Sequence, residues 1–367
     1  MPRTFALLAC LAAFTTTASA QSWDSEFGIQ SGYSRIKVAG TSAPDQIDVF
    51  GIPGFSLPGL LPAGASLFAV IPWKQQIAFE TSLSALQGNA VSLLGDASLF
   101  QLGVRGNYAL TPKVYAAAGG ALNWIESSGQ HETQLGVSGA LGYRFGFIRG
   151  LHARVEANVL FFGKSKLLMP ANVYSLEFGV SKQLGVRSRT TTAPARASSR
   201  AWQPMFGVQG GYTRSHAVGG GTDLTAVSIP GRGGAISVLG TPAGPPVLFT
   251  IVPIGRNIAI EPGLDISRLQ TSGTTIFGGN ISARLNYAVS GGWYAGAGGN
   301  LLYLKTSGAS AETATGVSLA WGYRFPLLSG LGGRFEIGYT MMAHNTKLGL
   351  PATNTLALQF GAMMPLR

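Results

Sequence analysis

The residues that could do chemistry in this 367-residue chain form two matching sets of glutamates and arginines. Arg105-Gly106-Asn107 returns as Arg284-Leu285-Asn286, and Arg154-Val155-Glu156 returns as Arg334-Phe335-Glu336. Acids and bases that are buried together form ion pairs, because an unpaired buried charge is costly. The candidate residues are Glu80, Arg105, Arg144, Arg154, Glu156, Glu261, Arg284, Arg324, Arg334 and Glu336.

Patterns typical of enzymes are missing from the sequence. The four histidines are His131, His152, His216 and His344, and none has a histidine at the matching position in the other half of the chain. His131 and His344 fall at loop edges, where a lipid-modifying enzyme would need them. There is no nucleophile elbow, phosphate-binding loop or cluster with metal-ligand spacing. We therefore predict no catalytic activity, no cofactor and no metal.

Composition excludes several classes of protein. Only 11% of the residues are charged, 52 are glycines and the mean hydropathy is +0.25, which does not fit a soluble enzyme or a disordered chain. The two long charge-free stretches, 49–73 and 233–255, are both interrupted by prolines, so neither predicts a membrane helix. A glycine-rich β protein fits best.

The first twenty residues have the pattern of a secretory signal peptide. Arg3 precedes the apolar stretch 5–14, and Ala18-Ser19-Ala20 forms an A-x-A cleavage site. Cys10 is the only cysteine, so the mature chain has none. We predict export and cleavage after residue 20.

The rest of the chain contains an internal duplication. Residues 21–184 and 204–367 align almost end to end, with Gly142-Tyr143-Arg144-Phe145 returning as Gly322-Tyr323-Arg324-Phe325. Residues 185–203 are rich in Ala, Ser, Thr and Arg, which is typical of a linker. The predicted organisation is a signal peptide (1–20), repeat 1 (21–184), a linker (185–203) and repeat 2 (204–367).

Alternating polarity predicts eight strands in each repeat. In repeat 1 they fall near 26–38, 66–73, 76–87, 97–110, 114–126, 133–147, 150–162 and 172–184. Long connections after strands 1, 3, 5 and 7 alternate with tight turns after strands 2, 4 and 6. Long loops at one end and short turns at the other are typical of an outer-membrane barrel.

This pattern resembles the small eight-stranded outer-membrane barrel family typified by OmpA and OmpX, over nearly the whole mature chain. The fold class that we predict is all-β, a membrane antiparallel up-and-down β-barrel, with two eight-stranded barrels in tandem. The alternative is one sixteen-stranded barrel, because an even number of strands returns the chain to the same side in both cases.

The polar faces of these strands carry Gly, Ala, Ser and Asn with few charges, which is too bland for a surface in water. We therefore expect the apolar faces to contact lipid and the ten charged residues to point into the lumen. There they could form a structural plug of ion pairs or, alternatively, a gate that opens by exchanging partners.

The first long loop of each repeat is apolar, which is unusual outside a membrane. Its candidate contact residues are Phe50, Ile52, Pro53, Phe55, Ile229 and Pro230. Such a loop could contact lipid, a hydrophobic ligand or a partner. Alternatively, it caps the barrel mouth or extends the first two strands.

The function that we predict is an outer-membrane barrel protein with a structural, surface-contact or lipid-contact role. A sixteen-stranded porin and a lipid-modifying enzyme are the alternatives. The partners expected are outer-membrane lipids, with extracellular or cell-wall contacts left open. The location and the lack of a basic, aromatic-laced motif exclude nucleic acid.

Overall fold

The computed structural model describes residues 23–38, 46–52, 66–90, 95–127, 129–148, 151–164, 170–184, 201–218, 224–229, 248–270, 273–328, 331–345 and 352–366. Repeat 1 contains β1 (Glu26–Val38), β2 (Gln46–Ile52), β3 (Ser66–Lys74), β4 (Ile77–Ala90), β5 (Gly95–Ala109), β6 (Val114–Ser127), β7 (Gln130–Ile148), β8 (Leu151–Phe162) and β9 (Ala171–Gln183). Repeat 2 contains β10 (Met205–Ala217), β11 (Leu224–Ile229), β12 (Leu248–Pro253), β13 (Ile258–Gln270), β14 (Thr275–Ser290), β15 (Trp293–Thr306), β16 (Glu312–Leu328), β17 (Leu331–Met342) and β18 (Thr353–Pro365). No helix among these residues is long and apolar enough to cross a membrane.

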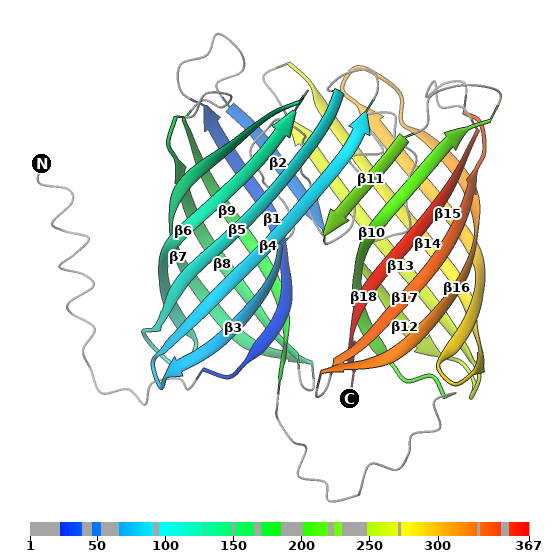
Figure 1. Cartoon of the computed structure of the whole chain (residues 1–367), viewed down its shortest axis with the longest axis horizontal. Helices are drawn as coiled ribbons and strands as arrows, with labels where there is room; N and C mark the ends of the chain where they lie inside the picture. The colour runs from blue at the N-terminus through cyan, green and yellow to red at the C-terminus, as the bar shows by residue number, and fades with distance from the viewer. Residues whose placement is uncertain are drawn as a thin grey trace, which may run out of the picture.

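The strands form two closed, antiparallel, eight-stranded barrels (Figure 1). In repeat 1 the pairing runs from β1 through β3 and β4 to β9, and β9 returns to β1. In repeat 2 it runs from β10 through β12 and β13 to β18, which returns to β10. The predicted fold of two eight-stranded barrels is confirmed, and the eight strands expected in repeat 1 agree with the observed ones to within three residues at each end.

The alternation along each strand separates an apolar outer wall from a polar lumen. In β7, Leu135 and Val137 are 69% and 63% exposed, whereas Gln134 and Arg144 on the other face are 2% and 6% exposed. Glycine and alanine fill much of the inner face, where bulky side chains of a narrow barrel would collide. The inverted distribution, apolar outside and polar inside, is the one expected for a barrel in lipid.

Two short strands depart from the prediction, because each lies in a long connection that the sequence analysis left as a loop. β2 pairs with β1 and also with β13 of the other barrel, through register pairs such as Asp48 with Gln270. β11 pairs with β10 and with β4 of the other barrel, through pairs such as Val227 with Gln87. Of the alternatives weighed for the first loops, strand extension is the one observed for residues 46–52 and 224–229, and it joins the two barrels.

The two exchanged strands change the architecture along the barrel axis. At the end with the tight turns, which we call the turn end, β3 and β12 close each barrel separately. At the opposite, loop end, the pairing runs from β9 to β1, β2 and β13, and returns from β18 through β10 and β11 to β4. Counted among the described strands, this loop-end circuit contains sixteen strands. The figure shows β11 beside β4 and β10 in the upper half of the molecule (Figure 1).

Apolar side chains also join the barrels near the turn end. Ile29 of β1 packs with Val208 of β10, next to Leu67 and Leu248. A second cluster joins Leu151 of repeat 1 with residues of repeat 2, among them Leu331 and Met364. The duplicated halves therefore contact each other both through strand pairing and through side-chain packing.

We expect the β2–β13 pairing to be detectable by disulfide cross-linking, since the predicted mature chain has no cysteine. Gly51–Ser267 and Phe50–Arg268 are successive register pairs, so one of them is of the closer, non-hydrogen-bonded type. With either pair changed to cysteine and a protease site placed in the linker 185–203, oxidation should keep the cut halves together on a non-reducing gel.

A cysteine pair at Ser34 and Val49 is the control, because it links β1 to β2 within repeat 1 and cannot hold the halves together. Halves that separate in both β2–β13 variants would contradict the exchanged pairing.

Candidate functional site

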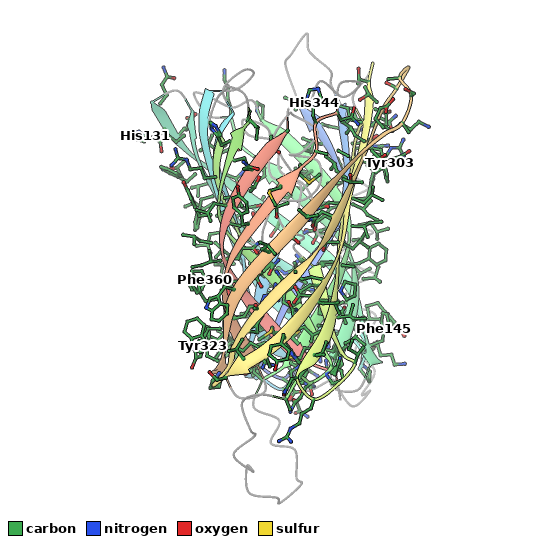
Figure 2. The ribbon with its side chains drawn as sticks, turned by 90° about the vertical axis from the view of Figure 1, so that its right-hand side faces the viewer. His131, Phe145, Tyr303, Tyr323, His344 and Phe360 are labelled. Carbon is green, nitrogen blue, oxygen red and sulfur yellow. The ribbon has the colours of Figure 1, made fainter. Side chains whose placement is uncertain are left out.

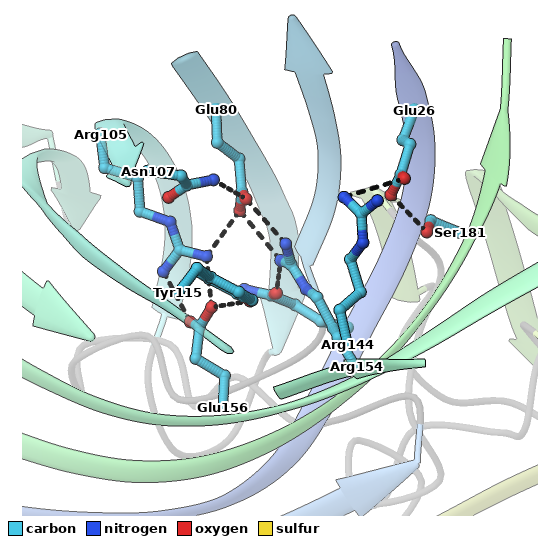
Figure 3. Close-up of polar contacts among 10 residues, drawn as sticks. Glu26, Glu80, Arg105, Asn107, Tyr115, Arg144, Arg154, Glu156 and Ser181 are labelled. Carbon is cyan, nitrogen blue, oxygen red and sulfur yellow. Dashed lines mark hydrogen bonds and ion pairs between the residues drawn. The ribbon is translucent and has the colours of Figure 1, made fainter. Parts of the chain in front are cut away.

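Each lumen is crossed by a cluster of ion pairs centred on one arginine. In repeat 1, the guanidinium of Arg105 donates from Nη1 and Nη2 to the two carboxylate oxygens of Glu156, at 2.6 and 2.5 Å. Its Nη2 also donates to Oε1 of Glu80 at 2.8 Å. Figure 3 shows Arg105 between the two carboxylates. A planar guanidinium suits this arrangement, since it can form paired hydrogen bonds with carboxylates.

A second arginine closes the network. Arg154 donates from Nη1 and Nη2 to Glu80 at 2.7 and 2.9 Å, and it also donates to Gln30. Its guanidinium carbon lies 3.5 Å from the centre of the Phe68 ring, a cation–π contact. Glu80 and Arg154 are both almost completely buried. Burial of this kind is tolerated because each charge faces an opposite charge and additional donors or acceptors.

Two neutral side chains complete the coordination of the carboxylates. The hydroxyl of Tyr115 donates to Oε2 of Glu156 at 2.7 Å, and the amide of Asn107 donates to Oε2 of Glu80 at 2.9 Å. We call the residues Gln30, Glu80, Arg105, Asn107, Tyr115, Arg154 and Glu156 the lumen cluster of repeat 1. Its two arginines and two glutamates have no net charge.

Repeat 2 contains the same cluster at the matching positions. Arg284 donates to Glu336 at 2.8 and 2.6 Å and to Glu261 at 2.8 Å. Arg334 donates to Glu261 at 2.8 Å and to Gln209, and it lies 3.6 Å from the centre of the Phe249 ring. The remaining donors are Tyr294 to Glu336 at 2.6 Å and Asn286 to Glu261 at 2.8 Å.

Local sequence explains how the clusters are assembled. Glu80 stands opposite Arg105 in the β4–β5 register, as Glu261 stands opposite Arg284 in the β13–β14 register. Gly142 lies under the Tyr115 ring, and a Cβ added there would come within 2.2 Å of the ring carbon Cζ. Glycine on the inner face therefore leaves the volume that the large cluster side chains occupy.

The cluster of repeat 2 borders a small cavity. In repeat 2, a cavity of about 20 Å³ is lined by residues that include Glu261, Arg284, Asn300 and Thr340. This is room for about one water molecule. The paired side chains occupy the interior of a barrel that is just wide enough to be filled by side chains.

The two barrels differ below the clusters, toward the turn end. In repeat 1, Arg144 lies 3.1 Å from Glu26, which also contacts His152 at 3.0 Å and accepts a hydrogen bond from Ser181 at 2.8 Å. Arg144 lies over the Trp23 ring, at 4.9 Å. In repeat 2, Met205 occupies the position of Glu26 and Gly332 that of His152. The matching Arg324 lies over the Trp202 ring at 3.9 Å.

The structure thus brings together eight of the ten predicted charged residues, four in each cluster. Arg144 joins a separate contact with Glu26, and Arg324 lies over Trp202, so neither belongs to a cluster. The sequence analysis missed the neutral members and Glu26. The neutral members had a readable signal, since Gln30, Asn107 and Tyr115 recur as Gln209, Asn286 and Tyr294.

The structure describes three of the six candidate contact residues of the first loops. Phe50 and Ile52 belong to β2, and Ile229 ends β11. Pro53, Phe55 and Pro230 lie outside the described residues.

The histidines that an enzyme would need stand at the loop end. His131 and His344 are exposed there (Figure 2). Within the described ranges, no group of three or more His, Cys, Asp or Glu side chains could hold a metal. The absence of catalysis stays a prediction.

Similarity to known proteins is found among solved structures. No protein-family model matches, and no curated protein sequence matches. Solved structures with some similarity include a bacterial polysaccharide outer membrane secretin (TM-score 0.32, 8% identity, 94% of this chain and 98% of that chain). Ail from Yersinia pestis (0.25, 15%, 44% and 99%) and OmpT, an outer membrane protein of Vibrio cholerae (0.25, 11%, 95% and 99%), are also similar. These similarities are too low to support an argument about function.

We expect the barrel to be strongly destabilised when one charged member of the lumen cluster is removed. Glu156→Gln removes a carboxylate that binds Arg105 and Tyr115, and breaking a buried ion pair on one side costs about 3–5 kcal/mol. The urea concentration at the midpoint of unfolding, followed by tryptophan fluorescence in detergent, should fall strongly.

The matched control is Glu177→Gln, which changes the carboxylate that stands opposite Glu156 in the β8–β9 register. Glu177 accepts a hydrogen bond from Ser175 at 2.9 Å, and repeat 2 already carries Gln359 at this position. We expect this variant to unfold close to the wild type. Equal destabilisation by both changes would contradict the role assigned to the ion pairs.

Proposed function

We propose that the protein is a bacterial outer-membrane barrel protein whose two lumens are closed and whose role lies in contacts that it makes at its outer end. Support for the membrane comes first from the outer wall. Large apolar side chains are exposed on the outer walls of both barrels away from the contact between them, for example Leu141, Phe178, Leu285 and Val317, at 55%, 55%, 54% and 53%. An apolar surface of this extent is expected to face lipid.

Exposed aromatic side chains supply the second support. Trp73, Tyr108 and Trp293 are close to the tight turns, and Trp293 stacks on Trp321 at 5.9 Å. Figure 2 shows Tyr323, Phe145 and Phe360 toward the turn end of the wall. Tryptophan and tyrosine collect where a membrane meets water, so this girdle fits one edge of a bilayer.

The orientation follows from the connections. Outer-membrane barrels have short turns toward the periplasm and long loops toward the outside. By this rule the turn end of both barrels faces the periplasm, and the loop end, with its exchanged strands, faces outward. Export by a cleaved signal peptide remains part of the proposal, and residues 1–20 lie outside the described residues.

The lumen clusters carry the functional part of the proposal. Each blocks an eight-stranded barrel with arginines and glutamates that are held by several hydrogen bonds and ion pairs. A permanently filled lumen favours a plug over a gate. The function of such a protein then depends on its outer surface, through structural, surface or lipid contacts.

The porin alternative meets a specific obstacle. A wide channel needs sixteen strands around one lumen over the full height of the membrane. The sixteen-strand circuit exists only at the loop end, because β3 and β12 divide the wall into two narrow barrels below it.

Electrical recording tests the closed state. We expect the full-length protein, inserted in a planar bilayer, to give no channel steps under conditions in which a known porin conducts. A double change of the central arginines, Arg105→Ala with Arg284→Ala, removes the side chains that cross each lumen and should produce small conductance steps if the variant folds.

Steady, large conductance of the unmodified protein would overturn the proposal and favour a porin. Insertion is verified independently by protease protection and by the mobility shift on boiling, so a silent recording from protein that never inserted is not counted. A lipid-modifying activity that is lost in His131→Ala or His344→Ala would favour the enzyme alternative.

A further inference from the structure

The outer wall carries a group of cations where β2 joins the two barrels. Across the paired strands β1, β2, β13, β14 and β15, one register row contains Tyr33, Phe50, Arg268, Phe277 and Lys305. Arg35 and Lys37 follow Tyr33 on the same face of β1. We call Arg35, Lys37, Arg268 and Lys305 the basic face. Two of these cations come from repeat 1 and two from repeat 2, so the exchanged strand creates the group.

These side chains point away from the lumen. Lys37, Arg268 and Lys305 are exposed, whereas Ser34 and Ile36, between the cations of β1, are buried. Arg268 donates to Gln270, its neighbour on the same face, at 2.8 Å. Neighbouring strands are about 4.8 Å apart. Arg268 and Lys305 stand two strands apart in the same register row, so their Cα atoms are about 10 Å from each other.

Among the described residues of β1 and β2 beside the basic face, the carboxylate of Asp48 is engaged by several donors. Asp48 accepts hydrogen bonds from Arg35 at 2.8 and 3.2 Å, from Tyr33 at 2.9 Å and from Gln46 at 3.1 Å. In the part of the chain that the structure describes, no carboxylate forms an ion pair with Lys37, Arg268 or Lys305. Three cations are thus left to attract an external anion.

The duplication supplies an internal comparison. The matching wall, over β10, β11, β4 and β6, carries His216 at the position of Lys37, Gln87 at that of Arg268 and Glu126 at that of Lys305. Only Arg35 has a charged equivalent of the same sign, Arg214. Since the same fold forms on that side without the other three cations, the barrel does not require them for its own stability.

The position of the basic face indicates the anion. In the same strands toward the turn end, Leu264, Ile281 and Leu301 are exposed apolar residues. Aromatic rings lie at the level of the cations: Tyr303 contacts Phe277, with 5.8 Å between ring centres, and Lys37 lies 6.0 Å from the centre of the Tyr174 ring. Figure 2 shows Tyr303 near the loop end of the wall. Cations directly above an apolar belt are at the height of lipid phosphates.

We propose that the basic face binds the phosphate group of an anionic lipid in the outer leaflet. The lipid's acyl chains lie along the apolar wall below, and its phosphate lies between Arg268 and Lys305, with Lys37 adding positive charge farther along the same wall. This inference rests on the membrane placement proposed above and does not depend on whether the lumens are closed.

The test is lipid binding to the full-length protein in detergent, measured by native mass spectrometry with phosphatidylglycerol and with phosphatidylcholine as probes. We expect the wild type to bind phosphatidylglycerol in preference, and added salt to reduce that preference. Arg268→Gln with Lys305→Glu copies the residues of the other wall and should weaken phosphatidylglycerol binding about tenfold or more, because each cation near an anionic headgroup contributes about a fivefold factor.

The reverse exchange, Gln87→Arg with Glu126→Lys, should add a second phosphatidylglycerol site. Unchanged lipid preference in the Arg268→Gln/Lys305→Glu variant, confirmed as folded by its mobility shift on boiling, would overturn the proposal. If excess inorganic phosphate, added at constant ionic strength, displaces the bound phosphatidylglycerol, then free phosphate and not a lipid is the ligand. Failure of the wild type to float with liposomes would instead count against the membrane placement itself.

Discussion

The interaction on which the structure depends most is the pairing of buried arginines with buried glutamates inside two narrow barrels. Arg105 and Arg284 each bridge two carboxylates, and an eight-stranded barrel has too little room to hydrate them fully. This constraint explains why the neighbouring inner positions are so often glycine, why Tyr115 and Tyr294 are directed at the same carboxylates, and why both halves repeat the arrangement with nearly identical distances. In each barrel the cluster lies between the loop end and the turn end of the lumen.

A second constraint acts on the backbone. Strand edges in a membrane must be paired, since lipid offers no hydrogen bonds. β4 and β13 extend beyond their partners β3 and β12, and their loop-end halves are paired by β11 and β2 of the opposite repeat. The exchanged strands supply hydrogen-bond partners for those edges and join the two barrels into one circuit of strands at the loop end. The basic face is a consequence, since residues of both repeats become neighbours on a single wall.

Much of this could be predicted from the sequence. Alternation of polar and apolar residues located the eight long strands of repeat 1, and the recurrence of Glu80 and Arg105 as Glu261 and Arg284 placed these residues among the lumen charges. β2 and β11 could not be found in the same way, because their short sequences do not alternate clearly and their pairing partners lie in the other repeat. Glu26 was missed because Met205 replaces it in repeat 2, so internal comparison gave it no support. The basic face required knowledge of which strands are neighbours.

The central claim is that each lumen is closed by its cluster, and side-specific cysteine labelling tests it most directly. His152 lies on the turn-end side of the repeat 1 cluster and Ser138 on the loop-end side, as the β7–β8 register shows. In liposomes that hold the protein in one orientation, a membrane-impermeant maleimide added at the loop end should leave His152→Cys unlabelled. The same reagent should label that cysteine when added at the turn end. Labelling of His152→Cys from the loop end, at a rate similar to that of Ser138→Cys, would mean that the lumen is continuous and would contradict the account.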